Sequence, residues 1–90
     1  MIIKHSAAAG TLESCDAVIS VAPAQGKSIQ VDSAVGALYK DAIIETVEQV
    51  LKEYDVSDIQ VTVMDRGALD CTLRARTKAA LERAMREEQT

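Results

Sequence analysis

The hydrophobic period of this chain changes from two residues to between three and four, and later changes back. Alternation of apolar and polar side chains is typical of a strand with one buried face, whereas steps of three and four residues are typical of an amphipathic helix. A chain of 90 residues has room for one domain. The switches between the two periods therefore predict one small domain, over residues 1–90, in which a sheet and helices share a core.

Three segments near the start of the chain are strand candidates. Residues 2–8 form a weak candidate that ends before Gly10. Residues 16–22 are rich in β-branched side chains and are closed by Pro23, and residues 28–32 alternate polar and apolar side chains. The short connection between the last two segments predicts that they pair as an antiparallel hairpin.

A first helix is expected over residues 34–54. Apolar side chains return there every three or four positions, and charged side chains fill most of the other positions. Ser33 comes just before this pattern and is the expected N-cap, because its hydroxyl can accept a free backbone N–H. The side chains expected on the buried face are Val35, Leu38, Ala42, Ile43, Val47, Val50, Leu51 and Tyr54.

The rest of the chain predicts one more strand and one more helix. Residues 58–64 alternate regularly, a turn signal follows, and Asp70 is the expected N-cap of a helix over residues 70–87. The expected apolar stripe of this helix is Leu73, Thr77, Ala80, Leu81 and Ala84, and its expected solvated side chains are Arg74, Arg76, Lys78 and Arg83. The fold class is therefore α+β, a small two-layer sandwich of order βββαβα with both helices on one face of a mainly antiparallel sheet.

Charge and composition argue against several classes of partner. Fourteen acidic and ten basic residues give a net charge of −4, which repels the phosphates of nucleic acids and of anionic membranes. Aromatic residues make up only 2% of the chain, too few for a base-stacking platform. No apolar run is long enough to cross a membrane, and the first residues turn polar too soon for a signal peptide. We expect a cytoplasmic protein with reduced cysteines and with neither nucleic-acid nor membrane partners.

Side chains suited to catalysis are scarce. His5 is the one histidine. Ser14, His5 and Asp16 are close in sequence, but closeness in sequence does not supply the geometry of a catalytic triad. Glu45 and Glu48 are expected on the solvated face of the first helix. No cysteine or histidine spacing suits a metal, and no glycine-rich loop suits a phosphate. The residues alone therefore predict an acidic α+β domain with no catalytic residue and no metal site.

Two separated motifs carry more information. The first is Gly10-Thr11-Leu12-Glu13-Ser14-x-Asp16, and the second is Asp65-x-Gly67-Ala68-Leu69-Asp70-Cys71-x-Leu73-Arg74-Ala75-Arg76. In sequence and in order, these motifs closely resemble the acyl carrier proteins, or gamma chains, of citrate lyase. The resemblance extends over nearly the whole chain.

The resemblance implies a carrier that is not itself a catalyst. In that family the serine of the Leu-Glu-Ser motif, which falls on Ser14 here, bears a phosphoribosyl dephospho-coenzyme A group through a phosphodiester. The thiol at the end of this group carries acetyl and then citryl as a thioester, between an alpha subunit (transferase) and a beta subunit (lyase). Turn-forming and polar residues surround Ser14 where two strand candidates meet, so we expect it in an exposed loop or at a strand edge. Such a place suits the prosthetic-group transferase that loads this serine in the family. Glu13 and Asp16 would either orient the loading enzyme or keep the loop solvated.

Several residues near the motifs have two interpretations. Cys15 stands where the family pattern leads us to expect glycine or another small residue. It is interpreted as a passive side chain, with a modification or oxidation site as the alternative. Cys71 is interpreted as a packed thiol. Arg74 and Arg76 either bind a phosphate or the acidic groups of a partner chain, or simply lie in solvent.

Alternatives to citrate lyase remain open at this point. The related carrier of malonate decarboxylase has the same kind of group on a serine, so it would share Ser14 and carry malonyl instead of citryl. An unmodified ligand-sensing or assembly domain is a second alternative, because small α+β sandwiches host many functions. A free-standing enzyme is a third, and it lacks a pairing of base and nucleophile.

Overall fold

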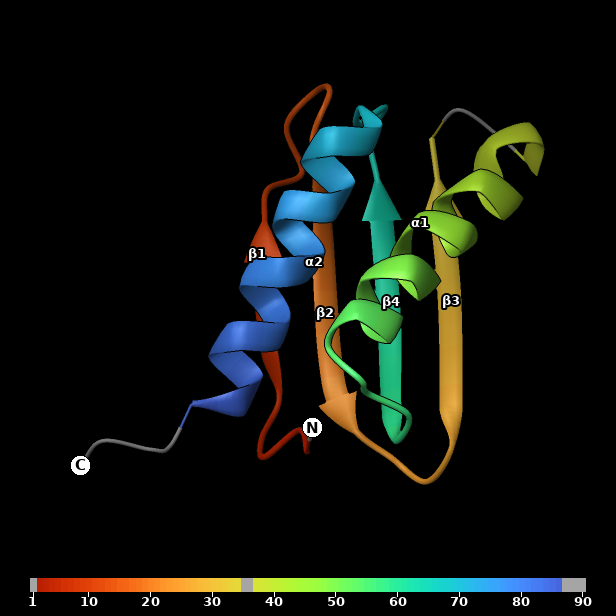
Figure 1. Cartoon of the computed structure of the whole chain (residues 1–90). Helices are drawn as coiled ribbons and strands as arrows, with labels where there is room; N and C mark the ends of the chain where they lie inside the picture. The colour runs from red at the N-terminus through yellow and green to blue at the C-terminus, as the bar shows by residue number, and fades with distance from the viewer. Residues whose placement is uncertain (1, 35–36, 87–90) are drawn as a thin grey trace.

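A four-stranded sheet carries two helices on one face in the computed structural model, which describes residues 2–34 and 37–86 (Figure 1). The strands are β1 (Ala7–Gly10), β2 (Ala17–Pro23), β3 (Lys27–Ser33) and β4 (Ile59–Asp65). The helical segments are a 3-10 turn, η1 (Ala37–Tyr39), and the helices α1 (Lys40–Glu53) and α2 (Asp70–Met85). The predicted α+β class and the order βββαβα are confirmed.

The last strand in sequence lies inside the sheet. The strand order is β1-β2-β4-β3, in which β1 and β2 pair antiparallel, β2 and β4 pair antiparallel, and β3 and β4 pair parallel. Helix α1 connects the two parallel strands, since parallel neighbours need a crossover. The sheet is therefore mixed, with two antiparallel pairs and one parallel pair.

The hairpin predicted from residues 16–22 and 28–32 is wrong. β2 and β3 do run in opposite directions, but β4 lies between them and pairs with both. The connection from β2 to β3 is bound to the start of β4. Gly26 accepts a hydrogen bond from the Ile59 amide at 3.0 Å and donates its own amide to Asp58 Oδ1 at 3.0 Å. The short connection therefore passes the start of β4 (Figure 1).

Helix α1 begins at Lys40, later than predicted. Ser33, the predicted N-cap, is the last residue of β3 and donates its hydroxyl to Asp65 Oδ2 at 2.9 Å. Leu38, predicted to be buried, lies in η1 and is 92% exposed, and Ala42 is exposed as well. Val35 and Gly36, also within the predicted helix, fall outside the described residues.

Helix α2 begins at Asp70, but Asp70 is its first residue and not its N-cap. Leu69 occupies the N-cap position without a side-chain cap, and the Asp70 carboxylate accepts the Thr46 hydroxyl at 2.6 Å instead. The helix ends at Met85, and the predicted end at residue 87 falls outside the described residues. The predicted apolar stripe is confirmed: the buried residues of α2 are Leu73, Thr77, Ala80, Leu81 and Ala84.

The core lies between the sheet and the two helices. Ile19, Val61 and Val63 of the strands and Val47 and Leu81 of the helices are all fully buried. Burying side chains of this size contributes about 1.5–3 kcal/mol each. Within residues 2–34 and 37–86, no helix combines the length and apolar character needed to span a membrane.

Candidate functional site: the Ser14 loop

Residues 11–16 connect β1 to β2 and are called the Ser14 loop here. The loop lies at the end of the sheet where β4 leads into α2 (Figure 1). Ser14 is exposed, and within the described residues no hydrogen bond holds its hydroxyl. Ser20 lies in β2 and Ser28 lies in β3. Among these three serines, Ser14 alone occupies a loop.

A tight turn places Ser14 at a corner of the chain. The Asp16 amide donates to the Glu13 carbonyl at 3.2 Å, and Cys15 has a φ of 65°. A positive φ at the third residue is the mark of a type II turn, in which glycine is favoured. This conformation explains why glycine is expected at position 15, and it shows that Cys15 adopts the turn at some cost in backbone energy.

Gly10 fixes the way in which β1 enters the loop. Its φ is +107°, and a Cβ at this position would lie 1.8 Å from the carbonyl oxygen of Ala17. No side chain fits there unless the backbone of β2 moves. The glycine of the first motif is therefore a requirement of the close contact between β1 and β2.

Asp16, at the end of the loop, is bound by Arg76 of α2. Arg76 Nε donates to Asp16 Oδ1 at 3.0 Å and Nη2 donates to Oδ2 at 2.8 Å. The Thr11 hydroxyl donates to Oδ2 at 2.6 Å, and the Ala17 amide donates to Oδ1 at 2.7 Å. Each carboxylate oxygen thus accepts two hydrogen bonds. The bonds from Arg76, followed by those from Thr11 and Ala17, hold the pKa of Asp16 well below its usual range.

Backbone hydrogen bonds join the Ser14 loop to the turn after β4. The Cys15 amide donates to the Arg66 carbonyl at 2.8 Å, and the Arg66 amide donates to the Asp16 carbonyl at 2.9 Å. Gly67, with a φ of 88°, continues this turn. The two sequence motifs therefore meet in space, and the residues that follow Ser14 are held to the turn after β4.

The arginines of the second motif are bound within the chain and also keep part of their surface in solvent, 34% of the side chain for Arg74 and 39% for Arg76. The prediction that they lie in solvent is therefore right only in part. Arg76 is occupied by Asp16. Arg74 donates to Asp70 at 3.2 Å, to Glu53 at 3.4 Å and also to Gln49. Their positive charges are thus largely used inside the protein. The opposite charges of the Asp in the first motif and the arginines in the second were the signal that could have predicted this contact.

His5 and Ser14 do not form a catalytic pair. The His5 ring nitrogens lie 2.9 Å from the Arg86 carbonyl and 3.1 Å from the Ser6 carbonyl. His5 thus contacts the end of α2, and Asp16 is bound by Arg76 instead. No group of three or more metal-ligating side chains gathers within residues 2–34 and 37–86.

Comparison with known proteins identifies the family. The family model described as "Malonate decarboxylase delta subunit (MdcD)", an acyl carrier family, matches residues 4–84. A citrate lyase acyl carrier protein of Haemophilus ducreyi is 46% identical over 87 residues, which are 97% of this chain and 92% of that protein. The chain belongs to the citrate lyase acyl carrier protein family. Relatives with the same name occur in Edwardsiella ictaluri and Serratia proteamaculans, each 48% identical over 93% of this chain and covering 88% and 84% of their own lengths.

Solved structures share the fold of this acyl carrier. One chain of a Pseudomonas malonate decarboxylase hetero-tetramer, crystallised with malonate, superposes with a TM-score of 0.80 at 21% identity, over 93% of this chain and 88% of that one. A Thermus thermophilus protein superposes with a TM-score of 0.61 at 16% identity, over 92% of this chain and 16% of that one. At these identities the likeness shows the fold alone.

The two thiols of this acyl carrier are both exposed and free. Cys15 is a turn residue, as its place in the motif implied. Cys71 is the second residue of α2 and faces solvent, so the prediction of a packed thiol is wrong. Cys71 lies outside the buried stripe of α2, which begins at Leu73.

Proposed function

We propose that this protein is the acyl carrier subunit of citrate lyase and that Ser14 Oγ bears a phosphoribosyl dephospho-coenzyme A group through a phosphodiester. The identity of 46–48% to relatives named citrate lyase acyl carrier protein carries the proposal. The residues around the attachment point suit such a group. Ser14 is exposed at a turn corner, so a loading enzyme can reach its hydroxyl without opening the fold.

The bound group supplies a terminal thiol, which holds acetyl or citryl as a thioester. The chain itself holds the arm at a fixed point between a transferase subunit and a lyase subunit. A tethered thioester is present at high effective concentration at both sites, so no free intermediate has to diffuse. The well-anchored Ser14 loop keeps the start of the arm in one place on the carrier. We propose no catalytic role for any residue of this chain.

Loading of single variants tests the attachment point. Ser14→Ala, incubated with the prosthetic-group transferase and its activated donor, is expected to gain no mass. Ser57→Ala, at an exposed serine before β4, is the matched control and is expected to gain the full group, as is Cys15→Ser. Because surface substitutions usually change stability by less than about 0.5 kcal/mol, Ser14→Ala should remain folded. Gain of the group by Ser14→Ala, or peptide fragments that place it on Cys15 or Ser20, would contradict the proposal.

A reconstitution assay tests the role. The loaded carrier alone should cleave no citrate, and activity should appear when the alpha and beta subunits are added. Cleavage by the carrier alone would contradict the assignment of a carrier without catalytic residues.

The carrier of malonate decarboxylase is the second candidate. The description of the matching family model and the shared fold of the Pseudomonas decarboxylase chain favour it. It would use the same serine and a malonyl cargo. The subunits that copurify from the native host decide between the two: a citrate-cleaving complex supports the first candidate, and a malonate-decarboxylating complex supports the second.

A further inference from the structure

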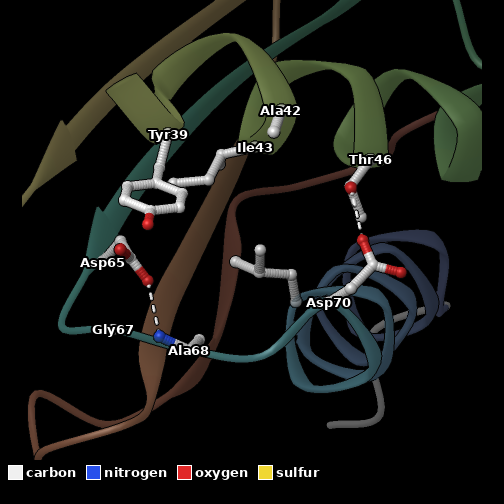
Figure 2. A pocket seen from close by; sticks show the side chains of 9 residues that line it. Tyr39, Ala42, Ile43, Thr46, Asp65, Gly67, Ala68 and Asp70 are labelled. Carbon is white, nitrogen blue, oxygen red and sulfur yellow. Dashed lines mark hydrogen bonds between the residues drawn. The ribbon is translucent and has the colours of Figure 1, made fainter. Parts of the chain in front are cut away.

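A cavity of about 310 Å³ opens beside the turn that holds the Ser14 loop. It lies between the start of α1, the residues after β4 and the start of α2 (Figure 2). Gly67 and Ala68 form one wall, and they directly follow Arg66, whose backbone binds Cys15 and Asp16. The cavity and the Ser14 loop therefore share one short segment of backbone.

Apolar side chains and two carboxylates on opposite walls line this cavity. Ala42, Ile43, Ala68 and Leu73 supply apolar surface. Asp65 is 1% exposed and accepts the Ser33 hydroxyl at 2.9 Å and the Ala68 amide at 2.9 Å, both neutral donors.

Asp70, on the far wall, is the second carboxylate of the lining. It accepts the Thr46 hydroxyl at 2.6 Å and Arg74 Nε at 3.2 Å. The bonds from Thr46 and then Arg74 lower its pKa, so it stays ionised. Arg74 is not a lining residue, and no cationic side chain is among the described residues that line the cavity: Tyr39, Ala42, Ile43, Thr46, Asp65, Gly67, Ala68, Asp70 and Leu73.

We propose that this cavity shelters the end of the arm when its thiol carries a neutral acyl group, acetyl, and excludes it when the thiol carries a polycarboxylate, citryl. This inference rests on the proposed attachment of the arm at Ser14. A neutral acetyl thioester gains apolar contact with Ile43 and Leu73.

The neighbouring cations do not line the cavity and are already bound: Arg66 Nη1 donates to the Asp65 carbonyl at 3.1 Å, and Arg74 donates to Asp70. A citryl thioester therefore brings free carboxylates toward Asp65 without a free cation to pair them, and burial of an unpaired charge is strongly unfavourable.

The proposal gives the carrier two states. The acetyl form rests with its thioester away from water, where attack of water to give acetate and free thiol is slowed. The citryl form leaves its arm in solvent, free to reach a partner subunit. The acyl exchange takes place on a partner subunit, after the arm has left the cavity, so the new acyl group decides whether the arm can return.

Two alkylated forms of the arm isolate the effect of charge. In a loaded carrier with Cys15→Ser and Cys71→Ser, the arm holds the sole thiol. Iodoacetamide gives a neutral carboxamide there, and iodoacetate gives a carboxylate of nearly the same size. Relative to the free thiol, we expect the carboxamide to shift the backbone amide resonances of Gly67, Ala68 and Leu73. We expect the carboxylate to leave them unchanged.

A plugged cavity supplies the second readout. Ala42→Phe fills the cavity from the exposed side of α1, and Ala75→Phe makes the same change on the exposed side of α2, away from it. With the arm acetylated, Ala42→Phe should lose the acetyl group several-fold faster than the parent, measured by intact mass, and Ala75→Phe should match the parent.

Asp65→Asn keeps the oxygen that accepts the Ala68 amide and should let the carboxylate form shift the cavity amides. Asp70→Asn provides the same test at the second carboxylate.

The outcomes separate this inference from the function on which it rests. A chain that never gains the mass of the arm overturns both. A loaded carrier whose cavity amides ignore the carboxamide, or respond equally to both alkylated forms, overturns the inference alone. Equal hydrolysis of the acetyl group in the parent and in Ala42→Phe also overturns it.

Discussion

The Asp16 carboxylate and the Arg76 guanidinium meet across 60 residues of sequence through two hydrogen bonds, of 3.0 and 2.8 Å. One residue closes the Ser14 loop, and the other lies in α2. Paired donors of this kind fix orientation as well as distance. The contact therefore determines how the loop is set against the helix.

Removal of Arg76 is expected to loosen the loop without unfolding the protein. In Arg76→Ala the Asp16 carboxylate keeps only the donors Thr11 and Ala17, so the loop opens more often. Hydrogen exchange at the Cys15 amide, which bonds to Arg66, should speed up while exchange in β4 stays near that of the parent. Lys78→Ala is the control. It removes an ion pair of 3.9 Å with Glu53, away from the Ser14 loop, and should leave hydrogen exchange at Cys15 unchanged. Unchanged exchange in Arg76→Ala would show that the ion pair does not hold the loop.

The same ion pair predicts a dependence of stability on pH. The pKa of Asp16 is lowered from its ordinary value of 3.8, so its contribution to stability is complete above that value and is lost as the pH falls toward the folded-state pKa. The difference in Tm between the parent and Asp16→Asn should be constant from about pH 7 to about pH 5 and should shrink below about pH 4. Thermal unfolding followed by circular dichroism measures this. A difference that persists unchanged in strong acid contradicts the prediction.

Gly10 and Gly26 form a matched pair for testing the close contact of β1 and β2. Both have positive φ, but a Cβ at Gly10 would strike the Ala17 carbonyl, whereas a Cβ at Gly26 meets nothing within 4 Å. Gly10→Ala should lower the free energy of unfolding by at least about 2 kcal/mol, because backbone strain and a clash act together. Gly26→Ala should cost only about 1 kcal/mol. Urea denaturation compares them, and equal losses would contradict the role given to Gly10.

Cys15 is expected to be a site where glycine stabilises the protein. Its φ of 65° costs an L residue roughly 1–2 kcal/mol, part of which the greater entropy of unfolded glycine offsets. Cys15→Gly should therefore raise the free energy of unfolding by up to about 1 kcal/mol, and Cys15→Val, with a branched Cβ, should lower it by about 1–2 kcal/mol. Urea denaturation in the presence of a reductant measures both. A more stable valine variant would contradict the turn geometry.

Tyr54 and Glu82 provide a spectroscopic test of how α1 sits on α2. The Tyr54 hydroxyl donates to Glu82 Oε2 at 2.6 Å, and this bond, with burial, raises the pKa of Tyr54 to about 12. In a Tyr39→Phe background, the phenol absorbance should titrate near that value. Glu82→Gln should move the midpoint back toward 10, the ordinary value. A midpoint near 10 in the Tyr39→Phe protein with Glu82 intact would mean that the two helices do not make this contact in solution.

The sequence predicted the secondary structure well where periodicity decides it. Alternation over residues 58–64 predicted β4, and the stripe beginning at Leu73 predicted the buried side of α2, because both patterns report which face meets the core. The start of α1 was predicted too early. Leu38 fits the spacing of a buried helical face in the sequence, but in the structure it lies exposed in the 3-10 turn η1. Periodicity cannot tell an exposed 3-10 turn from the first turn of a helix.

Strand pairing and the site contacts depended on distant residues. Alternation shows that β2 and β3 each have a buried face, but it does not say which strand lies beside them. The Ser14 loop itself was predicted as exposed from its turn-forming residues. Its anchors, Arg66 and Arg76, come from 50 or more positions later in the sequence, so periodicity could not predict them. The opposite charges of the two motifs were the one signal for the contact with Arg76.

The position of β4 also bears on when the folded Ser14 loop first exists during synthesis. Before residues 59–65 leave the ribosome, β3 has no strand to pair with and β2 has only β1, because β4 is the neighbour that they share. Arg66 and Arg76, which hold the turn at Ser14, emerge later still. A nascent chain thus displays the Leu-Glu-Ser sequence long before it displays the turn, and an enzyme that recognises the shape of that turn distinguishes finished carriers from unfinished ones.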